Sequence, residues 1–82
     1  MMKMSTYDRL VSCFRTVFPA LDDQEIAQAS IASLAKWDSL ATVTLVSVIE
    51  EEFGIEVRDT DLENFVSFDL IAETLTEYDE SA

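Results

Sequence analysis

The residues with the clearest chemical potential are Asp38 and Ser39, where an aperiodic stretch gives way to a strongly periodic apolar segment. This change of pattern predicts that a helix begins here, with Ser39 at or beside its N-terminus. Unpaired backbone N–H groups and the positive end of the helix dipole favour an anion at that place. A serine hydroxyl there is therefore well placed to carry a phosphate group, although the two residues alone would be read as an ordinary helix cap.

The composition favours a Ser39 that is modified by another protein over one that acts as a nucleophile. The chain contains no histidine, which excludes Ser–His and Cys–His nucleophile pairs. Cys13 is its one cysteine, so no disulfide can form within the chain. It lies at the margin of an apolar stripe with no evident cation pair beside it, which favours a small buried side chain over a reactive thiol. We therefore expect no enzymatic activity.

A metal site is not expected either. Asp59, Asp61 and Glu63 alternate as the first ligands of a calcium-binding loop do. The pattern then fails, because Asn64 stands where such a loop needs a glycine and Leu70 where it needs a bidentate glutamate. The sequence therefore predicts no bound metal.

The first predicted helix is followed by a long loop. Apolar residues recur at helical spacing over residues 7–18, between a start signal at Ser5 and a stop at Pro19. Residues 19–38 show no sustained period, and a loop of that length in a small domain usually has a role. The apolar residues expected to anchor it are Leu21, Ile26, Ile31 and Leu34.

Three further helices are predicted after the loop. The strongest pattern covers residues 39–53, and Gly54 fits the left-handed position that ends a helix. A capping box over Thr60–Glu63 predicts a third helix of one to two turns, and Ser67 or a neighbour begins the last helix. These elements predict an all-α fold, a small four-helix bundle of three longer helices and one short third helix, with a long loop between helices 1 and 2.

The length of 82 residues predicts a single domain. We expect residues 1–4 and 79–82, at its two ends, to be frayed.

The charge is unevenly distributed along the chain. Residues 1–37 hold four acids and four bases, which cancel, whereas residues 38–82 hold the other thirteen acids against Arg58 alone. The net charge of −12 therefore belongs to the half that begins at Asp38. Nucleic acid is excluded as a partner because its phosphates would be repelled, and basic protein surfaces are favoured. No apolar run reaches the ~20 residues of a membrane span. We expect a cytoplasmic protein and a monomer.

The Asp-Ser-Leu motif at residues 38–40 and its surroundings resemble the acyl carrier proteins. The likeness continues through Val43, Leu45 and the segment 50–57, and it covers most of the chain. It implies that a phosphopantetheinyl transferase attaches 4′-phosphopantetheine from coenzyme A to Ser39. The arm would then carry acyl groups as thioesters and present them to acyl-loading and acyl-transfer enzymes with basic docking surfaces.

The resemblance also has departures. Trp37 stands where the usual fatty-acid carrier has a small residue, and Thr44 and Ser47 replace a residue that is often glutamate and one that is often apolar. These differences favour a carrier that serves a specialised pathway.

Part of the helix over residues 39–53 is predicted to form a docking surface. At about 100° per residue, Leu40 and Val43 fall opposite the core side and among acids. An apolar centre with a polar rim is typical of a protein interface, although scattered exposed apolar residues are also common. Trp37 should pack mostly on the loop, with a share of its ring extending this surface. The residues assigned to partner binding are Asp38, Leu40, Val43, Glu50, Glu51, Asp59 and Glu63.

In the resembled family the second and third helices border a cleft that can take up an acyl chain. The corresponding apolar residues fit an ordinary core equally well, and they are Val46, Ile49, Leu62 and Phe65.

Two alternatives stay open. An aminoacyl carrier for cell-wall modification shares the Asp-Ser pair. An acidic helical adaptor that never receives an arm and binds one basic partner would show the same charge and helix pattern.

Overall fold

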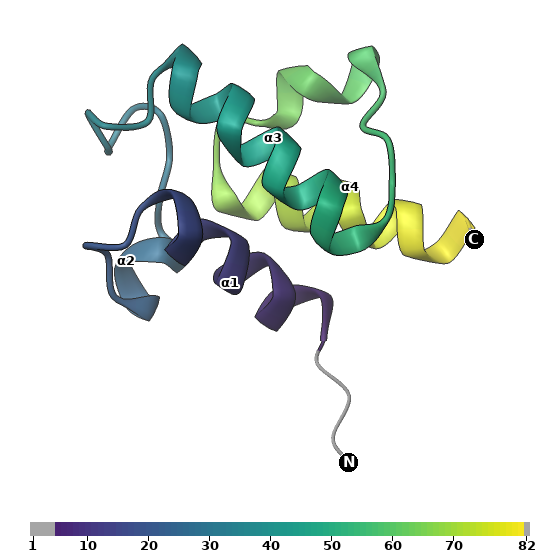
Figure 1. Ribbon diagram of the computed structural model, residues 1–82, viewed down its shortest axis with the longest axis horizontal. Coiled ribbons are helices and arrows are strands. Elements are labelled where there is room, and N and C mark those ends of the chain that lie inside the picture. The colour runs from purple at the N-terminus through teal and green to yellow at the C-terminus, as the bar shows by residue number, and fades with distance from the viewer. Residues whose placement is uncertain (1–4, 82) are drawn as a thin grey trace.

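The computed structural model describes residues 5–81, with side chains as far as Tyr78. Over these residues it is a bundle of helices without a strand, and its one isolated bridge joins Ser30 to Ser67 (Figure 1). The expected all-α fold is confirmed. The elements in chain order are the helices α1 (Thr6–Val17), α2 (Asp23–Ala27) and α3 (Ser39–Phe53), the 3₁₀ helix η1 (Asp59–Asn64) and the helix α4 (Phe68–Ser81).

The predicted boundaries of α1 and α3 are confirmed by their caps. Ser5 Oγ accepts a hydrogen bond from the backbone N–H of Asp8 at 3.1 Å, which satisfies one of the unpaired donors at the start of α1. Gly54 ends α3 with a φ of 64°, the left-handed conformation that glycine adopts without a Cβ penalty.

The segment between α1 and α3 contains one short helix, as the spacing of Asp22 and Glu25 predicts. Asp22 and Glu25 form a reciprocal capping box, which starts the five-residue helix α2. Ile26, on this helix, is fully buried as an anchor should be. The expectation that Ile31 anchors the same segment is wrong, because 49% of its surface is exposed.

The predicted capping box at Thr60 is also wrong. A short helix does form, but η1 begins at Asp59, so Thr60 lies inside it, and no side chain caps its start. The carboxylate of Asp61 instead accepts hydrogen bonds from Tyr78 Oη at 2.7 Å and from Arg58 Nε at 3.0 Å. These contacts tie the start of η1 to α4, which is a tertiary arrangement that local spacing does not encode.

The last helix begins where the sequence predicts and extends beyond the expected end. Ser67 Oγ accepts a hydrogen bond from the backbone N–H of Leu70 at 3.2 Å, and α4 then continues to Ser81. The expected fraying of residues 1–4 and 82 lies outside the described residues.

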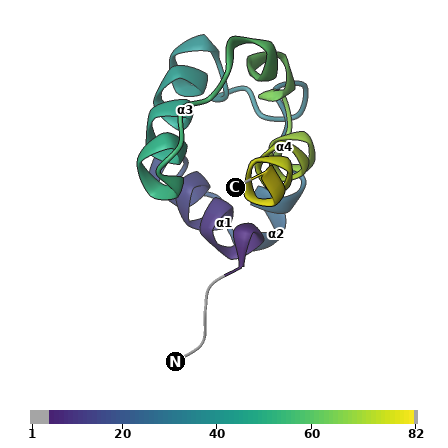
Figure 2. The same cartoon turned by 90° about the vertical axis from the view of Figure 1, so that its right-hand side faces the viewer.

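The core sits where α1 packs against α2, α3 and α4. Figure 2 shows α1 and α2 together in the lower part of the molecule, with α3 and α4 rising on opposite sides. At the centre, the ring of Phe14 contacts the rings of Phe18, Trp37 and Phe68 at centroid distances of 5.2–6.1 Å. Four residues of α3 are predicted to face the core from the helical period. Leu45 and Ile49 are fully buried, and Val46 and Phe53 are partly buried against the core. Phe65, Ile71 and Leu75 are also fully buried.

Candidate functional site

The junction between the long loop and α3 presents Ser39 to solvent. Asp38 is the N-cap, and its Oδ1 accepts a hydrogen bond from the backbone N–H of Ala41 at 2.9 Å. Ser39 is therefore the first helical residue and not the cap. It is exposed, and its hydroxyl makes no hydrogen bond to any described residue. The arrangement leaves a free hydroxyl at the positive end of a fifteen-residue helix, where a phosphate is favoured.

Trp37 holds this junction in place from inside the protein. Its side chain is only 3% exposed and packs edge-on against Phe14 and beside Phe18. The indole Nε1 donates a hydrogen bond to Thr42 Oγ1 at 2.9 Å, which satisfies the one polar atom of the buried ring. The prediction that part of the Trp37 ring extends the docking surface is therefore wrong, because packing against Phe14 and Phe18 leaves only 3% of the residue exposed.

The apolar centre of the predicted docking surface is exposed as expected. Leu40 is 75% exposed and Val43 is 63% exposed, and both lie on α3 beside Ser39. Glu51 is exposed on the same helix. Large apolar side chains in water carry a free-energy cost that burial against another surface would remove.

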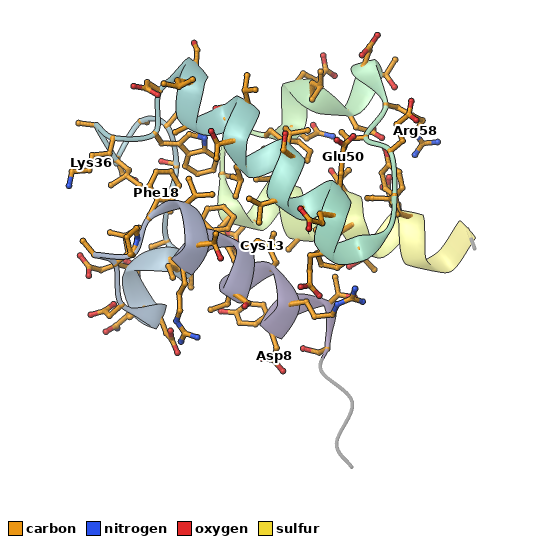
Figure 3. All side chains as sticks on the ribbon, in the orientation of Figure 1. Asp8, Cys13, Phe18, Lys36, Glu50 and Arg58 are labelled. Carbon is orange, nitrogen blue, oxygen red and sulfur yellow. The ribbon has the colours of Figure 1, made fainter. Side chains whose placement is uncertain are left out.

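Glu50 has a structural task that the sequence pattern does not reveal. Its Oε2 accepts a hydrogen bond from the backbone N–H of Val57 at 2.8 Å, and this pins the connector after Gly54 to the end of α3 (Figure 3). Glu50 is half-buried, whereas Glu51 is exposed. The connector therefore occupies one carboxylate oxygen of Glu50, and the assignment of this residue to partner binding stays a prediction.

The other assigned acids lie on a separate element. Asp59 and Glu63 are exposed on η1. Among the described residues, no hydrogen bond or ion pair joins them to the exposed residues of α3. Asp59 and Glu63 are thus exposed on a different element from Leu40 and Val43.

One cavity lies between α3 and η1 and reaches Ser39. Its volume is about 390 Å³, and Ser39, Leu62 and Phe65 line it. Two of the four residues proposed as a cleft are thus at this cavity, whereas Val46 and Ile49 do not line it. Ile31 lines it too, which sequence reasoning missed because its spacing resembled that of a loop anchor.

The comparison with known families agrees with this geometry. The sequence matches the model of the family described as "Phosphopantetheine attachment site" over residues 8–75, which include the Asp38–Ser39 junction. The chain belongs to this family. Domains of this kind receive 4′-phosphopantetheine covalently and act as non-catalytic carriers. No solved structure matches the chain.

The thiol of Cys13 is not available as a reactive group in this carrier domain. Cys13 is buried in α1, and burial first, then the nearby carboxylate of Glu52, raise its pKa from 9.0 to about 11. The nucleophilic species is the thiolate, so a raised pKa keeps the side chain inert near neutral pH. The prediction of a small buried side chain is confirmed.

The ionisable cluster beside η1 is structural. A hydrogen bond from Tyr78, followed by the Arg58 guanidinium, holds the pKa of Asp61 below its usual value. The Arg58 side chain also stacks over the Tyr78 ring, 4.6 Å from its centroid.

Within residues 5–78, the acidic side chains and the cysteine form no cluster that could hold a metal ion. No helix in the described part of the chain is long and apolar enough to cross a membrane.

Proposed function

We propose that this chain is an acyl carrier protein that bears 4′-phosphopantetheine on Ser39. The observation that supports this most is the free, exposed hydroxyl of Ser39 at the first position of α3, beside a cap that Asp38 already provides. A transferase would bring coenzyme A to this hydroxyl, and a phosphodiester formed there would lie at the helix N-terminus, which favours its negative charge. The arm would end in a thiol that bears the cargo as a thioester.

The partner surface in this proposal combines two features. Leu40 and Val43 supply apolar area that docking would cover, and the acids Asp38, Glu51, Asp59 and Glu63 attract basic partners. Surface charges of this kind mainly speed encounter and select partners, whereas the apolar contact supplies affinity. The transferase and the acyl-loading and acyl-transfer enzymes would therefore use overlapping contacts and exchange quickly.

The cellular context is part of the same proposal. We infer a cytoplasmic monomer, in keeping with a single cysteine that can form no disulfide within the chain. We also infer that the carrier serves a specialised pathway, on the basis of Trp37 beside the arm site and the polar Thr44 and Ser47 on the outer face of α3.

Intact-mass spectrometry tests the function. The protein is incubated with coenzyme A, Mg²⁺ and a broad-specificity phosphopantetheinyl transferase, and it should gain the mass of one phosphopantetheine group. The Ser39→Ala variant should gain none, while Ser47→Ala, a change of another exposed serine on the same helix, should be modified normally. If the wild-type protein gains no mass, the chain is an unmodified adaptor.

The cargo class needs a second measurement. An aminoacyl carrier is distinguished by the group found on the thioester after purification from the native cell, because an amino acid adds a free amine that a fatty or polyketide acyl group lacks.

A further inference from the structure

The exposed side of α3 carries a stripe of side chains whose charge is confined to one end. Its members recur at helical spacing, and they are Leu40, Val43, Thr44, Ser47 and Glu51. Only the last of them is charged. With a rise of about 1.5 Å per residue, Glu51 lies roughly 18 Å along the helix axis from Ser39. The part of the stripe beside the arm site therefore holds no acid of its own.

The two glutamates on either side of Glu51 are engaged within the protein. Glu52 Oε2 accepts a hydrogen bond from Arg9 Nε at 3.0 Å, in an ion pair that joins the end of α3 to the first turn of α1. Glu50 Oε2 binds the backbone N–H of Val57. Among the described residues, no hydrogen bond or ion pair engages the Glu51 carboxylate. Glu51 is therefore the acid of α3 that a partner can bind without breaking a contact.

The opposite end of the stripe lies beside a base. Lys36 is exposed on the loop before α3, and it lines a groove of about 700 Å³ together with Leu40 and Thr44 of the stripe. Figure 3 shows its side chain at the edge of the molecule with the amine directed outward. Lys36 forms no ion pair with a described residue, and Asp38 Oδ1 is directed to the backbone N–H of Ala41 as the cap of α3. The stripe thus begins beside an outward base and ends at an outward acid.

This arrangement distinguishes between two classes of protein partner. A uniformly basic surface would attract Glu51 but would meet the Lys36 amine as a like charge, which is unfavourable. A surface with an acid near its active-site entrance, an apolar centre and a base about 18 Å farther away would match all three parts of the stripe. Reversed docking of that surface would bring like charges together at both ends. The pattern therefore also fixes the orientation of the partner.

We propose that the stripe on α3, with Lys36 at its start, binds a phosphopantetheinyl transferase of the protein's own cell whose contact surface carries opposite charges at its two ends. The proposal rests on the function proposed above and specifies the chemistry of the docking partner. The transferase presents an acidic side chain to Lys36 beside its active-site entrance, apolar side chains to Leu40 and Val43, and a basic side chain to Glu51. Its surface is therefore not uniformly basic, although the net charge of the carrier is strongly negative.

Charge reversals at the two ends of the stripe test this pattern. The measured quantity is kcat/KM for the modification of Ser39 by the transferase purified from the native cell through this activity, with intact mass as the readout. We expect Lys36→Glu and Glu51→Lys each to lower kcat/KM roughly fivefold, since each change removes an exposed attraction and adds a repulsion. The two losses should multiply in the double variant, because the side chains are too far apart to interact. At roughly 0.5 M NaCl the differences should largely disappear.

Two matched variants control for the change in net charge. Arg15→Glu on α1 alters the charge as Lys36→Glu does, and Glu73→Lys on α4 alters it as Glu51→Lys does. Both residues are exposed and lie outside the stripe, so kcat/KM of both variants should stay within about twofold of the wild type. The broad-specificity transferase should bring every variant to complete modification, which shows that the fold and the Ser39 hydroxyl are intact.

The sign of the Lys36→Glu effect decides between the two classes of partner. A faster or unchanged reaction in this variant would indicate a uniformly basic transferase and overturn the proposal, while the carrier function would stand. Losses of the same size in the two controls would assign the effect to net charge and also overturn it. If the wild-type protein gains no mass with either transferase, the proposed function itself fails, and this proposal fails with it.

Discussion

Trp37 Nε1 and Thr42 Oγ1 are joined by a hydrogen bond of 2.9 Å that spans the arm site. Trp37 belongs to the loop and Thr42 to the first turn of α3, so this bond links the two segments on either side of Ser39. Thr42 Oγ1 also donates to the Asp38 carbonyl at 3.1 Å. The exposed serine thus projects from a backbone that is held by a buried ring.

Truncation of the Trp37 ring should remove much of the protein's stability. Trp37→Ala should lower the free energy of unfolding by about 3–5 kcal/mol, as large-to-small changes of buried aromatic residues do. Thr42→Val keeps the shape but leaves the indole N–H without its partner, which should cost about 1–3 kcal/mol. Urea denaturation followed by circular dichroism measures both. A loss below 1 kcal/mol in Trp37→Ala would show that the ring is not packed as described.

The two neighbouring glutamates at the end of α3 should behave differently. Glu50→Ala removes the acceptor of the part-buried Val57 N–H and should cost about 1–3 kcal/mol of stability. Glu51→Ala, at an exposed position, should stay within about 0.5 kcal/mol of the wild type. Glu51 should matter instead for the rate at which Ser39 is modified. Glu51→Lys should slow this reaction and remove part of its salt dependence. Equal stability of the two alanine variants would contradict the structural task of Glu50.

The exposed apolar residues of α3 should matter for docking and not for folding. Leu40→Ala and Val43→Ala should leave stability within about 0.5 kcal/mol, because both side chains are mostly in water. Each should lower kcat/KM for the transferase reaction about tenfold, which corresponds to 1.4 kcal/mol of lost contact. Ser47→Ala on the same helix is the matched control. Unchanged kinetics in both variants would remove Leu40 and Val43 from the docking surface.

The stability contributed by Cys13 should depend on alkaline pH. Burial raises the pKa of its thiol from 9.0 to about 11 in the folded state. The folded protein therefore holds this proton more tightly than the unfolded chain does, and the resulting stability is complete below pH 9.0 and disappears as the pH rises toward about 11. Subtracting the curve of Cys13→Ala isolates this effect from the tyrosines and lysines. A difference that stays flat over that interval would show that the thiol is solvated.

The sequence predicted features that depend on a few adjacent residues. Ser5 and Gly54 act as predicted, and Ser39 lies at the start of α3 as predicted, because the end of a helix depends on only a neighbouring turn of backbone. The exposure of Leu40 and Val43 followed from the helical period of α3 in the same way.

The failures share another cause, which is competition from partners distant in the chain or from tertiary packing. Asp61 joins Tyr78, seventeen positions later, and the predicted cap at Thr60 is not formed. Trp37 is buried because Phe14 on α1 and Phe18 at its C-cap form a site for the indole ring, and the sequence neighbours of Trp37 do not indicate this. A groove between the end of α1 and the start of α3 could not be predicted either, because its walls come from residues 16–21 and 34–44, two stretches that only the fold brings together.

The placement of α1 and α2 on one side of the molecule makes the protein an electric dipole. The stretch that contains those two helices, residues 5–37, holds four acids against three bases, whereas the stretch that forms α3, η1 and α4 holds thirteen acids against Arg58 alone (Figure 2). A basic surface at a distance of about one Debye length, roughly 8–10 Å, would exert a torque as well as a pull. The molecule would thus rotate before contact, so that its acid-rich side already faces the partner when the two first collide.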